Sequence, residues 1–184
     1  KTALICENRQ YDYAAMAAAV AVRAVWLRSE GINRGDRIAW YGMNHEEVFF
    51  LLFACARIGA ILVPLNWRLA EAEVTGIVAD CDPKFVVHDD HFAEPAARLS
   101  GCKIVSVTAF AALLRGFDGS EEIADASQND PLLIVYTSGS TGQPKGVVLS
   151  QKALIANAAM SVEAHALTSN GTVLNVLPMF HVGG

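Results

Sequence analysis

Short apolar runs typical of β-strands alternate along this chain with longer segments typical of helices. Four runs carry the strand pattern: RIAWY at 37–41, ILVPL at 61–65, KFVVH at 84–88 and KIVSV at 103–107. Helices are predicted around them at 13–30, from 44 to about 58, at about 70–81 and near 91–99. This alternation is typical of strand–helix–strand units. The sequence therefore predicts an α/β fold with a largely parallel sheet flanked by helices on both faces.

Local signals mark where two of these helices start and stop. Gly31 follows the first helix and is placed as its C-terminal stop. Asn44 can cap the second helix, and Glu47 follows three residues later, as a capping box requires. Glu46 and Glu47 both favour the positive end of the helix dipole. We interpret them as helix-start charges and not as a catalytic pair, because adjacent residues on a helix point about 100° apart.

A polar, acidic stretch at 116–129 interrupts the alternation and predicts a surface loop. A subdomain boundary is expected in the loop 116–130. The apolar pattern then returns with predicted strands at 131–137 and 146–150, a helix at 151 to about 166 capped by Ser150, and a strand at 172–178.

Size and charge exclude several classes of protein. The chain has 184 residues, of which 53% are hydrophobic, and its formal net charge is −5. A chain of this length buries roughly 70% of its extended surface, which is enough for one domain with a substantial core. Its apolar fraction excludes a disordered chain. The acidic balance and the absence of a Lys or Arg run argue against a nucleic-acid partner.

No transmembrane segment is predicted. The longest apolar stretch, 48–65, is interrupted by Arg57, Gly59 and Pro64, so it reads as a buried helix followed by a strand. The first residues show no basic region followed by an apolar one, so we expect no signal peptide and a cytoplasmic protein. The cysteines form no C-x-x-C pair and are expected to be reduced and buried: Cys6, Cys55, Cys81 and Cys102.

The segment YTSGSTGQPKGVV at 136–148 is the part of the sequence that points to chemistry. Its hydroxyl and glycine residues are Thr137, Ser138, Gly139, Ser140, Thr141 and Gly142, and Lys145 follows them. Glycines let backbone N–H groups approach an anion, hydroxyls add donors and the lysine adds charge, so the loop predicts a polyphosphate site. It does not match a Walker A loop, because Lys145 stands between a proline and a glycine, and the chain contains no G-x-G-x-x-G. From composition alone, a hairpin loop of small polar residues remains the alternative.

This segment resembles the signature phosphate loop of the adenylate-forming superfamily, which includes acyl-CoA synthetases, adenylation domains of peptide synthetases and luciferases. The resemblance covers the whole chain. GAILVPLNWRL at 59–69 resembles the early strand and loop of acyl-CoA ligases, and Asn66 and Arg68-Leu69 favour that branch over amino-acid-activating domains. LPMFHVGG at 177–184 resembles the motif whose histidine lies beside the acyl pocket. Gln151 departs from the family, because many relatives have a histidine there, but it changes no catalytic assignment.

The resemblance implies a two-step reaction of a small-molecule carboxylic acid, fatty or aromatic, with ATP, Mg²⁺ and coenzyme A. The acid would attack ATP to give an acyl-adenylate, and coenzyme A would then displace AMP. Residues 137–142 and Lys145 would bind the leaving phosphates, with Lys145 as the catalytic charge. Thr137 is the candidate hydroxyl near Mg²⁺, and His181 is the candidate residue at the acid site.

Each of these residues has a structural alternative. His181 lies beside Met179 and Phe180, so a packed core histidine is the competing interpretation. The other histidines are expected at the surface or at strand ends: His45, His88, His91 and His165. The tryptophans are expected in the core and not as ligand platforms: Trp26, Trp40 and Trp67.

Members of the resembled family continue for several hundred residues beyond the motif at His181. We therefore expect residues 1–184 to be a partial N-terminal AMP-binding domain, without the rest of that domain and its mobile C-terminal lid, and inactive in isolation. Two other functions remain open: an amino- or aryl-acid adenylation domain that loads a carrier protein, and a non-catalytic truncated homologue that binds nucleotide. A homo-oligomer formed through an exposed sheet edge or apolar face is also expected.

Overall fold

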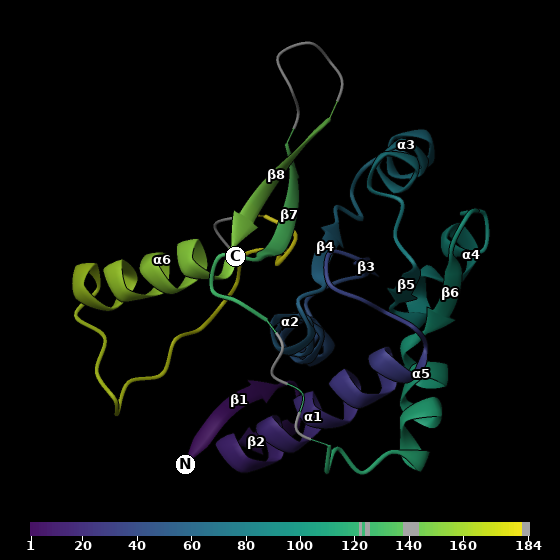
Figure 1. Cartoon of the computed structure of the whole chain (residues 1–184). Coiled ribbons are helices and arrows are strands. Elements are labelled where there is room, and N and C mark those ends of the chain that lie inside the picture. Colours follow the sequence, from purple (N-terminus) through teal and green to yellow (C-terminus); the bar gives the residue numbers. More distant parts are fainter. Residues whose placement is uncertain (122, 124–125, 138–143, 182–184) are drawn as a thin grey trace.

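A computed structural model describes residues 1–121, 123, 126–137 and 144–181, and its centre is a six-stranded sheet (Figure 1). The strands, in spatial order, are β6 (Lys103–Ser106), β5 (Phe85–His88), β3 (Arg37–Tyr41), β4 (Ile61–Leu65), β7 (Pro131–Thr137) and β8 (Lys145–Ser150). The first five pair in parallel, and β8 pairs antiparallel to β7. The predicted α/β fold with a largely parallel sheet is confirmed.

Helices pack on both faces of this sheet, as predicted. One face packs against α1 (Tyr13–Ser29), α2 (Glu46–Ile58) and α5 (Val107–Leu113), in a core that contains Trp26 and Trp40. The other face packs against α3 (Glu71–Cys81) and α4 (Ala93–Ala96). The strands β3, β4 and β5 are almost wholly buried, because they lie between these two layers.

The other elements lie at the margins of the molecule. A hairpin of β1 (Thr2–Cys6) and β2 (Arg9–Asp12) packs beside α1. Two short 3₁₀ turns follow at η1 (Asp90–Phe92) and η2 (Leu114–Gly116). The helix α6 (Gln151–Ala164) follows β8, and the Ser150 hydroxyl caps it by accepting from the Ala153 N–H, as predicted.

Two sequence predictions about strands are wrong, and one pair of strands was not predicted. No strand forms at 172–178, where the described chain is irregular and pairs with no other strand, so the apolar pattern there lacks the hydrogen-bonding partner that a strand requires. The strand predicted at 103–107 ends at Ser106, and Val107 begins α5 because the Ser106 hydroxyl caps that helix. The hairpin of β1 and β2 was not predicted.

The predicted capping box at the start of α2 is also wrong. His45, and not Asn44, is the N-cap, and its Nδ1 accepts from the Glu47 N–H at 3.0 Å. The Glu47 carboxylate turns away from the cap and binds Arg23. Gly31, by contrast, adopts φ +80° just after α1, as a helix stop requires.

All four cysteines are free thiols. Cys55 and Cys81 are buried as predicted, whereas Cys6 and Cys102 are only partly covered. No helix in the described part of the chain combines the length and apolarity needed to cross a membrane. The subdomain boundary expected in 116–130 stays a prediction.

Candidate active site

The loops that follow the parallel strands gather at one edge of the sheet. The crossover after β3 runs through α2 on one face, and the crossover after β4 runs through α3 on the other face. The chain therefore reverses its winding between these two neighbouring strands. In open parallel sheets, ligands bind at the carboxyl ends of the strands at this kind of switch point. The loops 42–45 and 66–70 border it.

The hairpin of β7 and β8 brings the flanks of the glycine-rich loop to the same edge, since β7 lies beside β4 (Figure 1). Thr137 pairs with Lys145 in the antiparallel register, and both side chains are exposed. Within the described residues, Lys145 has no ion-pair partner. The predicted phosphate-binding residues Ser138, Gly139, Ser140, Thr141 and Gly142 lie outside the described residues.

Tyr136, the first residue of the 136–148 segment, connects β7 to α3. Its phenol donates a hydrogen bond to the Asp80 carboxylate. Burial, together with the hydrogen bond to Asp80, raises the pKa of the Tyr136 phenol well above its usual value, so the group remains a donor. Gly146 makes room for this ring, because a Cβ there would lie 3.2 Å from Tyr136 Cζ and 2.9 Å from Ile134 Cγ2.

The segment 177–181 lies against the switch point and joins two of the motifs. The Phe180 ring meets the Trp67 ring edge-on, with their centroids 6.3 Å apart. The Arg68 guanidinium lies over the Trp67 ring, 4.9 Å from its centroid. The structure therefore brings the LNWRL segment and the LPMFH segment together. No contact that the structure records in the described residues joins His181 to Thr137 or Lys145.

His181 lies at the rim of a cavity of about 1030 Å³ between the sheet, α2, α6 and the segment 167–181. The side chain is exposed, so it is not the packed core histidine of the competing interpretation. The floor of the cavity is apolar and includes Phe49, Leu52, Leu62, Pro64, Leu133 and Val135. Apolar walls with a few polar groups at the rim are typical of sites for organic ligands.

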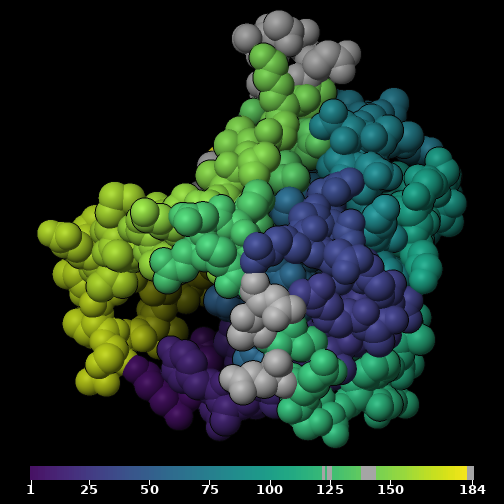
Figure 2. Space-filling model, viewed as in Figure 1, coloured from purple at the N-terminus to yellow at the C-terminus, as the bar shows by residue number. Residues whose placement is uncertain are grey.

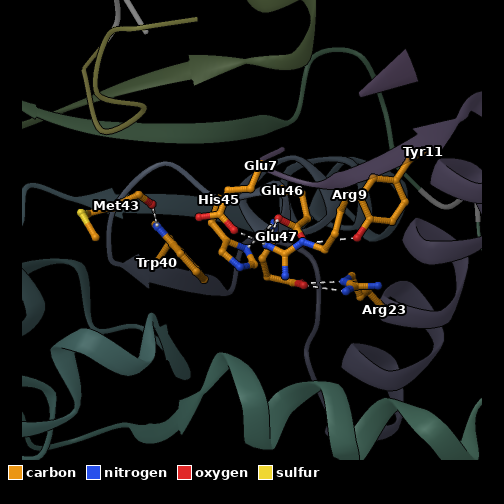
Figure 3. Close-up of polar contacts among 9 residues, drawn as sticks. All are labelled: Glu7, Arg9, Tyr11, Arg23, Trp40, Met43, His45, Glu46 and Glu47. Carbon is orange, nitrogen blue, oxygen red and sulfur yellow. Dashed lines mark hydrogen bonds and ion pairs between the residues drawn. The ribbon is translucent and has the colours of Figure 1, made fainter. Parts of the chain in front are cut away.

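Sequence reasoning missed a buried polar cluster beneath this edge, drawn in Figure 3. Glu46 and Glu47, expected as helix-start charges, are only 5% and 3% exposed. The Arg23 guanidinium binds the two oxygens of Glu47, each at 2.5 Å. Arg9 and Tyr11, from the hairpin, donate to the Glu46 carboxylate at 2.9 and 3.1 Å. No local signal reveals these pairs, since the partners lie 24 to 37 residues apart.

The carboxyl group of Glu46 is held ionised by this cluster. Burial alone would raise its pKa, but hydrogen bonds from its own backbone and from Cys6 and the positive charge of Arg9 outweigh it and lower the pKa. The oxygens of both carboxylates accept hydrogen bonds within the cluster. The two glutamates therefore anchor the hairpin and α1 to the start of α2.

The remaining predicted residues are placed as follows. His88 ends β5 and is buried, with its Nδ1 2.9 Å from the Asp89 carbonyl oxygen. His91 and His165 are exposed, and Trp67 is half-buried. In the part of the chain that the structure describes, no group of three or more His, Cys, Asp or Glu side chains could hold a metal ion. Thr137 as a ligand near Mg²⁺ stays a prediction.

Known proteins share sequence similarity with this chain. The profile of the family described as AMP-binding enzyme matches residues 1–184. The chain is 40% identical to indoleacetate–CoA ligase from Aromatoleum aromaticum, an alignment that covers 100% of this chain and 38% of the relative. It is 36% identical to feruloyl-CoA synthase from Amycolatopsis, over 92% of this chain and 34% of the relative.

Solved structures show the same fold. ATP-bound MatB from Rhodopseudomonas palustris superposes with a TM-score of 0.83 at 26% sequence identity, over 94% of this chain and 36% of that protein. The chain thus spans well under half the length of the relatives that it matches.

Proposed function

The chain belongs to the AMP-binding enzyme family, and on that premise we propose that the whole protein activates a carboxylic acid with ATP and transfers the acyl group to coenzyme A. A carboxylate oxygen attacks the α-phosphorus of ATP, and pyrophosphate leaves with the electrons of the broken P–O bond. The coenzyme A thiolate then attacks the acyl carbonyl carbon, and AMP leaves. The relatives named above, a CoA ligase and a CoA synthase, support this reaction.

One observation of the structure carries the proposal: the exposed Lys145, without an ion-pair partner among the described residues, opposite Thr137 at the base of the glycine-rich loop. An exposed cation and a hydroxyl at the switch-point edge suit a polyphosphate. In the proposed reaction Lys145 stabilises the negative charge that develops on the leaving pyrophosphate. A fixed charge contributes most when it points to where charge develops in the transition state.

Mg²⁺ fits this site only together with the nucleotide. Thr137 supplies one hydroxyl oxygen, and Mg²⁺ in such sites takes most of its ligands from phosphates and water. We propose that the ion enters with ATP and neutralises phosphate charge there.

The apolar cavity beside His181 is the proposed site for the body of the acid. Its volume of about 1030 Å³ is large enough for an aromatic ring with a side chain. The named substrates of the two relatives, indoleacetate and a feruloyl group, are aromatic, so we propose an aromatic acid in preference to a fatty acid. His181, at the rim, would meet the carboxylate end of the acid.

The test is acid-dependent exchange of label between pyrophosphate and ATP by the whole protein, with a panel of aromatic and aliphatic acids. Lys145→Ala should lower exchange by about tenfold to a hundredfold, the equivalent of one charge-assisted hydrogen bond. Lys152→Ala is the matched control, because Lys152 is an exposed lysine at the start of α6 and should leave exchange unchanged. Exchange that depends on no acid, or that survives Lys145→Ala intact, would overturn the proposal.

A further inference from the structure

The side-chain amide of Asn44 uses both of its ends on a distant part of the chain. Its Nδ2 donates to the Leu177 carbonyl at 2.8 Å, and its Oδ1 accepts from the Met179 N–H at 2.9 Å. The amide therefore binds the backbone of 177–179 as a neighbouring β-strand would, with one donor and one acceptor. More than 130 residues separate the partners in sequence.

The loop that presents Asn44 is held on several sides. The Trp40 indole N–H donates to the Met43 carbonyl at 3.1 Å, and the His45 ring lies over Trp40 with centroids 5.5 Å apart (Figure 3). Gly42 is pressed against Asp89, since a Cβ on Gly42 would lie 2.5 Å from the Asp89 Cβ. Because His45 caps α2, Asn44 is free of that task.

The segment that Asn44 binds is held on the molecule by these two hydrogen bonds together with the packing of Met179 on the core and of Phe180 on Trp67. Two further hydrogen bonds of this segment are local: the Leu177 N–H to Asn175 Oδ1 at 3.0 Å, and the His181 N–H to the Pro178 carbonyl at 3.1 Å. These fix the shape of the turn but not its place on the molecule. The two bonds from Asn44 tie the turn to the end of β3, and the turn ends at His181.

We propose that Asn44 is a positioning residue that sets where His181 lies relative to the acid cavity. The proposal rests on the proposed function, because it assigns His181 to the acid side of that reaction. Asn44 touches neither substrate nor nucleotide in this role. Its effect belongs to the binding of the acid and not to the binding of ATP, whose phosphates are assigned to the hairpin of β7 and β8.

The first experiment compares Asn44→Ala, Asn44→Asp and Asn33→Ala in the whole protein. Asn33 is a matched control, because its amide donates only within its own turn, to the Gly31 carbonyl. Losing two neutral hydrogen bonds should raise KM for the acid by about tenfold, with KM for ATP within about twofold of the parent. A general loss of stability would change KM for the acid and KM for ATP together, or would change neither.

Asn44→Asp adds a readout that depends on pH. The ionised carboxylate can accept from Met179 but cannot donate to the Leu177 carbonyl, whereas the protonated acid can do both. The ratio of KM for the acid in this variant to that in the parent, measured at each pH, should fall as the pH is lowered towards the carboxyl pKa. A ratio that is independent of pH overturns the positioning role.

Hydrogen exchange of the Met179 amide separates this proposal from the proposed function. Asn44→Ala should accelerate that exchange by about tenfold or more, and Asn33→Ala should not. If the parent protein shows no acid-dependent activity but the Met179 amide responds, the proposed function fails and the bond to Asn44 stands. If the amide does not respond, or responds while KM for the acid stays unchanged, the positioning role is overturned.

Discussion

At the scale of a single residue, Gly146 is a glycine of the 136–148 segment that lies in β8, beyond the glycine-rich loop, and packing explains why it is a glycine. A Cβ on Gly146 would collide with Ile134 Cγ2 and crowd the Tyr136 ring. Gly146→Ala should therefore displace the Tyr136 phenol from Asp80 and lower the free energy of unfolding by about 1–3 kcal/mol. Gly76→Ala is the control, because nothing lies within 4 Å of that Cβ in α3. There alanine should raise helix stability by up to about 1 kcal/mol. Equal effects of both substitutions in urea unfolding would contradict the steric argument.

The buried cysteines give a second prediction at this scale. Burial raises the pKa of Cys55 to about 12 and that of Cys81 to about 11. The thiolate is the reactive form, so neither should react measurably with a disulfide reagent at about pH 8 in the native protein. Cys6 and Cys102, which are partly covered, should react first. A thiol titration before and after adding guanidinium measures this, and four rapid native thiols would contradict it.

At the scale of elements, the ion pair of Arg23 and Glu47 joins α1 to α2. The side chains are 12% and 4% exposed, and the guanidinium also lies over the Phe50 ring, 4.6 Å from its centroid. Arg23→Ala would leave a buried carboxylate without its partner, so we expect a loss of about 3–5 kcal/mol in the free energy of unfolding. Arg98→Ala removes two exposed pairs, with Glu71 and Glu94, and should cost no more than about 1 kcal/mol. Similar losses for both variants would contradict this assignment.

Glu46 predicts a dependence of stability on pH. Because its pKa in the folded protein is lowered from 4.5, its contribution is complete above that value and is lost as the pH falls through the lower, folded pKa. Glu46→Gln should therefore be less stable than the parent near neutral pH, and the difference should shrink below about pH 4. Urea unfolding at a series of pH values measures it. A difference that grows as the pH falls would reverse the sign of the argument.

Elements whose signals are local could be predicted from the sequence, and contacts between distant residues could not. Gly31 stops α1 and Ser150 caps α6, because each acts within one turn of its own helix. Asn44 looked equally suited to cap α2, but a backbone more than 130 residues away binds its amide, and His45 takes the cap. The strand expected at 172–178 fails for the same reason, since a strand is defined by its neighbour and not by its own residues.

The same distinction between local signals and distant contacts applies to the candidate site. The composition of the loop after β7 predicts a phosphate site, which stays a prediction, and the structure shows only that Lys145 at the base of the loop is exposed. The approach of Phe180 to Trp67 could not be derived from spacing, because it depends on how 177–181 folds back onto the sheet edge. The buried role of Glu46 depends on a hairpin that carries no strong sequence signal, and that of Glu47 depends on Arg23 of α1, 24 residues away.

At the scale of the whole molecule, burial is uneven. β3, β4 and β5 lie between two helical layers, whereas α6 has no buried residue. Figure 2 shows α6 and the segment after it, in yellow-green and yellow, projecting from one side with an opening beside them. Among the described helices and strands, hydrogen exchange should therefore be slowest in the central strands and fastest in α6, since local opening of α6 exposes little further apolar surface.

The same unevenness predicts that the 184-residue chain associates with itself. Large apolar side chains are exposed on β8 and α6, with Val148 at 56%, Ile155 at 55% and Met160 at 61%. Among the described strands, β8 also lies at the edge of the sheet, which favours pairing with another chain. Sedimentation velocity should show a mean mass that rises with concentration, and the double variant Val148→Lys with Ile155→Glu should remove most of that rise. Ile5→Glu is the control, because Ile5 is 58% exposed but lies on the hairpin of β1 and β2. If Ile5→Glu suppresses association as strongly as the double variant does, the contact surface is not β8 and α6.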